Sequence, residues 1–298
     1  MGVLEEIQES VEGIAGQLEG SVVGIGHRWA HGSGIIISDG RVVTNAHNVH
    51  GEEVTVSFGD GRSLPGKVAG TDADGDLAVI TVDTGESRPL EWGDPGSISI
   101  GRPVFAASNP GGRGLRVTFG LVSAVQRSFR GPRGRMIRGA IEHTAPLLPG
   151  SSGGPLVDTD GRLLAINTNR LGEGFYLALP ADESLQGKVD ALGRGQTQRR
   201  PRLGIGIAPS HVAKGLRRAV GLPEADGLLV RHVEDDTPAA AAGLSEGDLI
   251  VEAGGRTLAS VDELYEVLDT AGPELDVTVL HGTEERRLKI ALGGKSEE

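Results

Sequence analysis

The stretch Pro149-Gly150-Ser151-Ser152-Gly153-Gly154-Pro155 decides the fold of this chain. Ser152 stands two positions after one glycine and directly before Gly-Gly-Pro. Glycines let the backbone turn sharply, so the N–H groups of Gly150 and Ser152 can point into solvent. A serine held in this way can attack a carbonyl carbon while the two N–H groups bind the oxyanion. The alternative is a glycine-rich turn between strands, and the rest of the chain decides between the two.

A serine nucleophile needs a base, and the base needs a group that orients it. Upstream, the apolar pair Val42-Val43 leads into Thr44-Asn45-Ala46-His47, which predicts that His47 lies at the rim of a β-barrel. Asp76 precedes the apolar run Leu77-Ala78-Val79-Ile80, where a partly buried carboxylate can accept a hydrogen bond from an imidazole. We therefore predict a catalytic triad of His47, Asp76 and Ser152, with an oxyanion hole formed by the N–H groups of Gly150 and Ser152.

The spacing of apolar runs indicates the architecture. From Val22 to about Pro180, β-branched runs alternate with turns of Gly, Asp and Pro, which is typical of antiparallel barrels. A chain of 298 residues with 48 glycines has room for two domains with many tight turns. We predict a short closing helix over 181–192. The polar segment 193–201 is predicted to be an interdomain linker.

These stretches resemble the HtrA (Deg) family of trypsin-like serine proteases with PDZ domains. The matching segments are 32–49, 76–80, 107–111, 118–125, 150–157 and 161–168. The resemblance implies a mostly β fold over 21–192, with two six-stranded barrels and the triad in the cleft between them. It also implies ATP-independent endopeptidase activity on unfolded or damaged proteins. Ser151 and Thr144 depart from the family, which often has asparagine and an acidic residue there.

The same resemblance points to the substrate pocket. In trypsin-like folds the residue six positions before the nucleophile lies at the floor of the pocket for the P1 side chain. Here that residue is Pro146, flanked by Leu147 and Leu148, so no carboxylate is present to pair with arginine or lysine. We therefore expect cleavage after small or medium apolar residues, with Asn167 and Thr168 as further pocket residues.

After the linker the pattern changes to that of a small α+β domain. Ala242-Gly243-Leu244, then Gly247-Asp248-Leu249-Ile250 and a helical run over 261–268, resemble a bacterial PDZ domain over 202–294. We expect the N–H groups around Leu203-Gly204-Ile205 to bind a peptide's C-terminal carboxylate, and the strand that follows to pair with that peptide. Val261 and Leu264 would form the opposite wall. The alternative is a β-domain that binds no ligand.

Residues 1–20 predict an amphipathic helix. Leu4, Ile7, Val11, Ile14 and Leu18 are spaced by three and four residues and form one apolar stripe. The stripe can dock on the chain's own barrel or contact another subunit. The resemblance implies a homo-oligomer, a trimer, but residues 1–20 lack the aromatic residues that family trimers use. The sequence leaves the oligomeric state open.

Composition limits the partners and the compartment. The net charge of −12 argues against nucleic-acid binding, and the absence of cysteine excludes disulfides and thiolate metal sites. No cofactor is expected. The first residues contain two glutamates and no long apolar segment follows, which predicts a cytoplasmic protein with no membrane span. The alternative is an extracytoplasmic protein whose leader has been removed.

Three further clusters were considered as sites. Asp72, Asp74 and Asp76 imitate a calcium loop but lack its glycine and its later ligands. His27 and His31 have no third ligand to complete a metal site. The arginine-rich run 127–138 is interpreted as a solvated loop rather than a nucleic-acid site, and by resemblance it takes the place of the family's sensor loop, which relays PDZ occupancy to the active site.

Together these features predict a serine endopeptidase that cleaves unfolded or misfolded proteins. Its PDZ domain would bind C-terminal peptides for substrate capture or activation. The alternative function is that of a PDZ-containing chaperone or scaffold with little resting protease activity.

Overall fold

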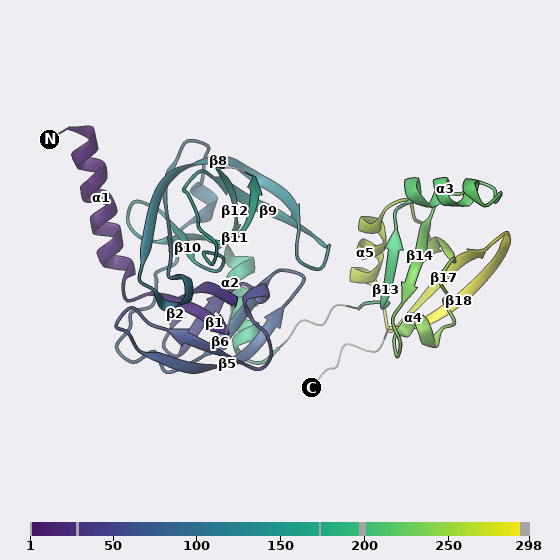
Figure 1. Ribbon diagram of the computed structural model, residues 1–298, viewed down its shortest axis with the longest axis horizontal. Helices are drawn as coiled ribbons and strands as arrows, with labels where there is room; N and C mark the ends of the chain where they lie inside the picture. Colours follow the sequence, from purple (N-terminus) through teal and green to yellow (C-terminus); the bar gives the residue numbers. More distant parts are fainter. Residues whose placement is uncertain (1, 28–29, 173, 197–200, 293–298) are drawn as a thin grey trace. The chain divides into compact units, whose positions relative to one another are not determined.

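The computed structural model describes residues 2–27, 30–172, 174–196 and 201–292. The chain divides into two compact units, residues 1–198 and 199–298 (Figure 1). The division falls within the predicted linker, of which residues 197–200 lie outside the described residues. The predicted fold class is confirmed: a double six-stranded barrel is followed by a small α+β domain.

The first barrel is closed by six antiparallel strands in the order β1-β2-β3-β6-β5-β4. Inward-facing side chains alternate with outward-facing ones, as in β4, where Val54 and Val56 are buried between exposed neighbours. A short 3-10 turn, η1 (Ala46–Asn48), leaves the barrel directly after β3. The strands are β1 (Val22–His27), β2 (Ala30–Ser38), β3 (Arg41–Thr44), β4 (Glu53–Ser57), β5 (Ser63–Asp72) and β6 (Leu77–Thr81).

The second barrel closes in the order β10-β11-β12-β9-β8-β7. The glycine-rich segment quoted above forms the turn between β9 and β10 at one end of this barrel. A 3-10 turn, η2 (Pro95–Ser97), lies in the connection from the first barrel to the second, and another, η3 (Pro110–Gly112), lies between β7 and β8. The strands are β7 (Pro103–Ser108), β8 (Arg116–Arg130), β9 (Met136–His143), β10 (Pro155–Val157), β11 (Leu163–Gly172) and β12 (Phe175–Pro180).

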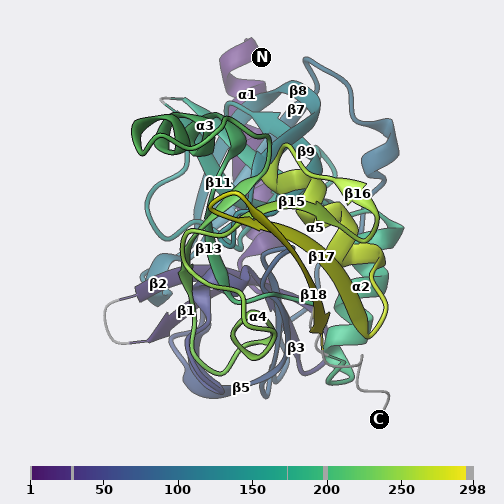
Figure 2. The ribbon, with the colours of Figure 1, turned by 90° about the vertical axis from the view of Figure 1, so that its right-hand side faces the viewer.

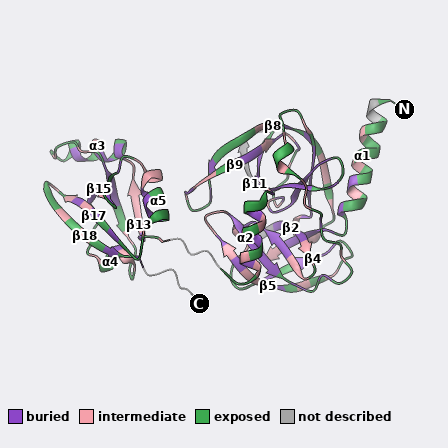
Figure 3. Cartoon of the chain, turned by 180° about the vertical axis from the view of Figure 1, so that it is seen from behind, coloured by how far each residue is buried: buried purple, intermediate pink, exposed green. Residues whose placement is uncertain are grey.

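Two helices flank the barrels. In α1 (Val3–Leu18) the side chains of Ile14 and Leu18 are buried in the main apolar cluster of the barrels. The preceding part of α1 is mostly exposed (Figure 3), so the C-terminal half docks the helix on its own unit. The side chain of Leu4 lies outside the described residues. The predicted closing helix is α2 (Glu183–Gly193), which begins where the Asp182 carboxylate accepts a hydrogen bond from the Leu185 N–H.

The second unit is a sheet in the order β13-β14-β15-β17-β18, with β16 paired to β15 (Figure 2). The sheet encloses its own apolar cluster, which includes Leu203, Val230, Ile250 and Val279. Strand β13 pairs only with β14, so it is an edge strand among the described residues. The elements are β13 (Ile205–Ala208), α3 (Ser210–Ala219), β14 (Leu228–Val233), α4 (Pro238–Ala241), β15 (Leu249–Ala253), β16 (Arg256–Thr257), α5 (Val261–Thr270), β17 (Glu274–His281) and β18 (Glu284–Ala291).

Within the described ranges, no helix has both the length and the apolar character needed to cross a membrane.

Candidate active site

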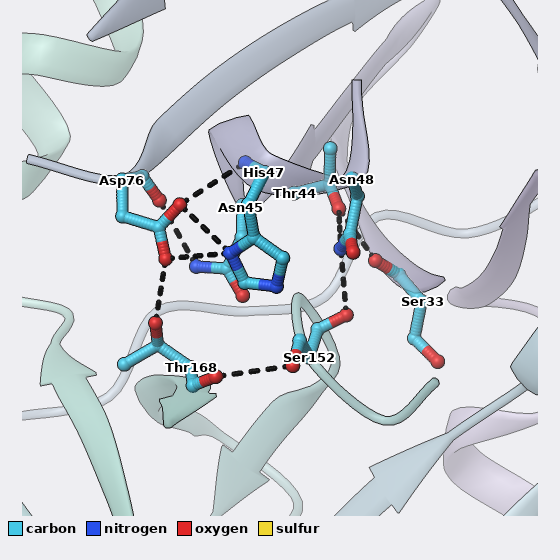
Figure 4. A network of polar contacts seen from close by, with 8 residues as sticks. All are labelled: Ser33, Thr44, Asn45, His47, Asn48, Asp76, Ser152 and Thr168. Carbon is cyan, nitrogen blue, oxygen red and sulfur yellow. Dashed lines mark hydrogen bonds and ion pairs between the residues drawn. The ribbon is translucent and has the colours of Figure 1, made fainter. Parts of the chain in front are cut away.

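The predicted base and its orienting group come from the first barrel. His47 lies in η1, and Asp76 ends the turn before β6. Nδ1 of His47 is 2.9 Å from each carboxylate oxygen of Asp76, and the His47 backbone N–H donates to Oδ1 at 3.1 Å. Asp76 is only 1% exposed, whereas the His47 side chain is 37% exposed. The carboxylate therefore fixes the ring with Nδ1–H as donor and leaves Nε2 as the basic nitrogen, on the side of Ser152 (Figure 4).

Asp76 is held in a conformation that non-glycine residues rarely adopt. Its φ is 55°, in the left-handed region. The side chain of Asn45 donates from Nδ2 to the Asp76 carbonyl at 3.0 Å and supports this turn. Such local strain is common where the surrounding structure has to aim a functional group.

The predicted nucleophile, Ser152, lies in the turn of the second barrel. Its hydroxyl donates to the carbonyl of Thr168 at 3.0 Å, and within the described residues no hydrogen bond joins it to His47. The expected serine–histidine hydrogen bond is thus not made in this state. Catalytic hydrogen bonds are often long or poorly aligned without substrate and tighten only when it is bound.

The backbone around Ser152, where the sequence predicts an oxyanion hole, contains two glycines in the left-handed region. Gly150 and Gly153 both have a φ of 87°, the conformation for which glycine is favoured. Among the described residues, the backbone N–H groups of Gly150 and Ser152 donate to no protein acceptor. Backbone donors without a protein acceptor in the described part of the chain are available to bind a developing oxyanion.

Thr168, predicted as a pocket residue, lies in the triad itself. Its hydroxyl donates to Oδ2 of Asp76 at 2.7 Å, while its carbonyl accepts the hydroxyl of Ser152. It comes from β11 of the second barrel and is 7% exposed. One residue therefore bridges the orienting carboxylate and the nucleophile, a role that sequence reasoning missed.

Two more residues that sequence reasoning missed hold the nucleophile turn. Ser33, on β2, donates from its hydroxyl to the Gly150 carbonyl and from its N–H to the Ser152 carbonyl, both at 2.9 Å. Asn48 donates from Nδ2 to the same Ser152 carbonyl, also at 2.9 Å. The first barrel thus fixes the backbone of the turn that belongs to the second.

The other predicted pocket residues differ in their environment. Pro146 and Leu148 are exposed, and Leu147 packs against the second barrel's core. Asn167 is completely buried, and its amide is occupied inside the barrel: Nδ2 donates to the Pro155 carbonyl, and Oδ1 lies 2.9 Å from Nε2 of His143. The Asn167 side chain is therefore committed to the barrel interior and not to a ligand.

In the second unit, the residues predicted to bind a peptide carboxylate lie at the start of β13 and directly before it. Gly204 has a φ of 78°, and the N–H groups of Leu203 and Gly204 donate to no protein acceptor among the described residues. Ile205 begins the edge strand β13. Arg202, beside the loop, forms an ion pair with Glu234.

The two residues predicted to form a wall on α5 differ in burial. Val261 is partly buried, but Leu264 is 2% exposed and belongs to the core of the unit. The partly buried Tyr265, four residues after Val261, lies on the same helix face and replaces Leu264 in our assignment. The physical reason is that α5 carries two adjacent apolar stripes, and Leu264 lies on the one that packs inward.

Members of the aspartate cluster and of the arginine-rich run make contacts within the fold. Asp72 accepts from the Gly75 N–H at 2.9 Å, and Asp74 pairs with Arg135 at 3.4 Å, so these carboxylates do not converge on an ion. In the arginine run, Arg127 pairs with Glu142 at 3.2 Å. The side chains of His27 and His31 lie outside the described residues. Within the ranges that are described, no group of three or more acidic or histidine side chains is arranged to hold a metal ion.

Comparison with known proteins agrees with this architecture. The model of the trypsin-like peptidase domain matches residues 32–166, and that of the PDZ domain matches residues 201–292. A probable periplasmic serine endoprotease, DegP-like, from Halomonas elongata is 34% identical over 271 residues, which cover 88% of this chain and 56% of that protein. The putative serine protease HhoA of Synechocystis sp. is 33% identical over 279 residues, which cover 88% of this chain and 69% of the relative.

Solved structures give the same result. The HtrA-type protease AlgW with a decapeptide aligns with a TM-score of 0.68 at 24% identity, covering 97% of this chain and 99% of that one. The same protease with a tripeptide aligns with a TM-score of 0.61 at 28% identity, covering 95% and 96%. The chain spans little more than half the length of the first curated relative that it matches.

Proposed function

Because the chain belongs to the HtrA family of trypsin-like serine proteases with a PDZ domain, we propose that it is a serine endopeptidase. The observation that carries this proposal is the Asp76–His47 pair, fixed at 2.9 Å beside a serine turn with two free N–H donors. We assign residues 21–192 to the protease domain, 193–201 to the linker and 202–294 to the PDZ domain.

The proposed reaction follows from the geometry. The Ser152 hydroxyl turns from the Thr168 carbonyl to Nε2 of His47 and attacks the scissile carbonyl, while His47 takes its proton. The Gly150 and Ser152 N–H groups bind the oxyanion of the tetrahedral intermediate. His47 then returns the proton to the leaving amine. Asp76, with the Thr168 hydroxyl and the His47 N–H on its oxygens, keeps the imidazole oriented and stabilises its cationic form.

The hydrogen bond of the Ser152 hydroxyl supports one addition to this proposal, a resting state of low activity. Because it rests on the Thr168 carbonyl rather than on His47, the protease would have little resting activity until substrate or a PDZ ligand is bound. A chaperone or scaffold that never cleaves is the second candidate, and the intact Asp76–His47 pair argues against it.

The substrates and partners form the second part of the proposal. We propose unfolded proteins as substrates, cleavage after small or medium apolar residues near Pro146 and Leu147, and apolar C-terminal peptides as ligands of the PDZ domain. Four relatives are named periplasmic, so we propose an extracytoplasmic site of action; the predicted cytoplasmic location finds no support in the comparisons. A homo-oligomer, in which the exposed half of α1 contacts another copy, remains part of the proposal.

The test is to incubate the chain with an unfolded, casein-like protein and with a serine-directed fluorophosphonate, then to map the label by mass spectrometry. Both reactions are run with and without a peptide that has an apolar C-terminal residue. We expect label on Ser152, cleavage of the substrate, and loss of turnover by about 10⁶-fold in Ser152→Ala, because triad members act as a unit. Neither label nor cleavage, even with the peptide present, would leave the scaffold as the function.

A further inference from the structure

Asn48 directly follows the proposed base and reaches the proposed nucleophile. It is the last residue of η1 and is 8% exposed. Its Nδ2 donates to the carbonyl of Ser152 at 2.9 Å and to Oγ1 of Thr44 at 3.0 Å. An amide nitrogen carries two hydrogens, so both donors of Asn48 are used (Figure 4).

The orientation of this amide is fixed by chemistry. The Ser152 carbonyl can only accept, and Oγ1 of Thr44 spends its own hydrogen on the Ser33 carbonyl at 2.6 Å. Both partners of Asn48 therefore require a donor, and the amide oxygen cannot replace the nitrogen.

The Asn48 side chain packs closely against the backbone at two glycines, Gly32 and Gly153. A Cβ added at Gly32 would lie 2.3 to 2.5 Å from the side-chain atoms of Asn48. A Cβ added at Gly153 would lie 2.2 Å from the Ser33 carbonyl oxygen and 3.1 Å from Nδ2 of Asn48. A side chain at Gly32 or Gly153 would therefore collide with Asn48 or its neighbours, so both positions need glycine for the amide to lie where it does.

We propose that Asn48 is a positioning residue that sets the distance and orientation of Ser152 relative to His47. This role presupposes the proposed function, in which His47 activates Ser152. His47 and Ser152 belong to different barrels, and their approach depends on contacts that cross between the barrels. Asn48 is covalently next to the base and is hydrogen-bonded to the backbone of the nucleophile, so it transmits the position of one to the other. Small displacements of reacting groups are costly to the rate.

The test compares the parent chain with Asn48→Asp and Asn48→Ala. Asn48→Asp keeps the shape and replaces the donor by an acceptor; Asn48→Ala removes the side chain. Thr84→Val is the matched control, because Thr84 is also buried, at 1% exposure, and accepts from the Gly40 N–H away from the triad. For each protein we measure the fluorophosphonate labelling rate per labelled Ser152, kcat and KM for one peptide, and the melting temperature.

We expect kcat and the labelling rate to fall by about tenfold in both Asn48 variants, the loss of one well-placed hydrogen bond. KM should stay within about twofold of the parent, because substrate contacts are unchanged. The labelling rate is expressed per Ser152 that reacts. A variant that is partly unfolded would therefore not show a lower rate for that reason alone. Thr84→Val should lose stability but keep its rate.

Two results would refute the inference, and they differ. If the parent is labelled and the Asn48 variants react at the parent's rate, Asn48 has no positioning role although the protease function stands. If the parent is labelled under no condition, the proposed function fails and the positioning role with it.

Discussion

His143 is a titratable group sealed inside the second barrel. It is completely buried, its Nε2–H donates to Oδ1 of Asn167, and its ring stacks on Tyr176 at 5.7 Å between centroids. Nδ1 has no hydrogen-bond partner within the described residues. Burial lowers the pKa of His143 to about 4, with the Asn167 hydrogen bond opposing that shift only in part. The ring is therefore neutral in the folded protein near neutral pH.

This burial makes stability depend on pH in a defined direction. The unfolded chain takes up the His143 proton near pH 6.5, whereas the folded chain does not until pH is about 4. The stability that the neutral, buried His143 contributes is thus fully present above about pH 6.5 and is lost as the pH falls toward 4. Between pH 7 and pH 5, His143 alone should remove about 2 kcal/mol from the free energy of unfolding. The variant His143→Gln keeps a donor for Asn167 but does not titrate. Between pH 7 and pH 5, we expect its free energy of unfolding, measured in urea, to fall by about 2 kcal/mol less than that of the parent.

The control for this expectation is the acid dependence of the remaining carboxylates, which both proteins share. If the two proteins lost equal free energy of unfolding between pH 7 and pH 5, burial of His143 would not be the cause.

At the scale of elements, the edge strand β13 directly follows a loop in which, among the described residues, the N–H groups of Leu203 and Gly204 have no protein acceptor. Gly204 has a φ of 78°, and a Cβ there would lie 2.3 Å from Cγ2 of Thr237. We therefore expect Gly204→Ala to shift the loop and its N–H groups. A peptide with an apolar C-terminal residue should bind the parent by pairing with β13, and amidation of its carboxylate should weaken binding by about tenfold, the value of one charge-assisted hydrogen bond.

Calorimetric titration with matched acid and amide peptides measures both effects. In Gly204→Ala the acid peptide should lose its advantage over the amide. Gly272→Ala is the matched control, because a Cβ at Gly272 meets nothing within 4 Å. Equal affinities of the two peptides for the parent would show that this loop is not a carboxylate site.

At the scale of the whole molecule, each unit has its own apolar core. The cluster around Leu203, Ile250 and Val279 consists only of residues from the second unit, and the barrel clusters consist only of residues from the first. We therefore expect residues 199–298 alone to bind the peptide with an affinity within about twofold of the full chain. Residues 1–198 alone should still react with fluorophosphonate at Ser152 but should not respond to the peptide. A truncated protease that the peptide still activates would place the ligand site in the first unit.

Much of this could be predicted from the sequence, because several features are local. The turn around Ser152, the Thr-Asn-Ala-His rim and the Asp76 position each stand in a short pattern, and the barrels follow from the spacing of apolar runs. The contacts of Thr168 with Asp76 and of Asn48 with Ser152 join residues 92 and 104 positions apart, and no local pattern marks them. On α5, two neighbouring apolar stripes compete for the core, and periodicity alone did not show that Leu264 faces inward.

The division of the triad between the barrels has a consequence for the growing chain on the ribosome. Strands β1 to β6, with His47 and Asp76, are complete at Thr81, whereas Ser152 and Thr168 are synthesised much later. A chain that ends before Ser152 therefore contains the proposed base and its orienting carboxylate but no proposed nucleophile. Competence for the proposed hydrolysis therefore requires synthesis to have passed Thr168, the last of these four residues in the chain.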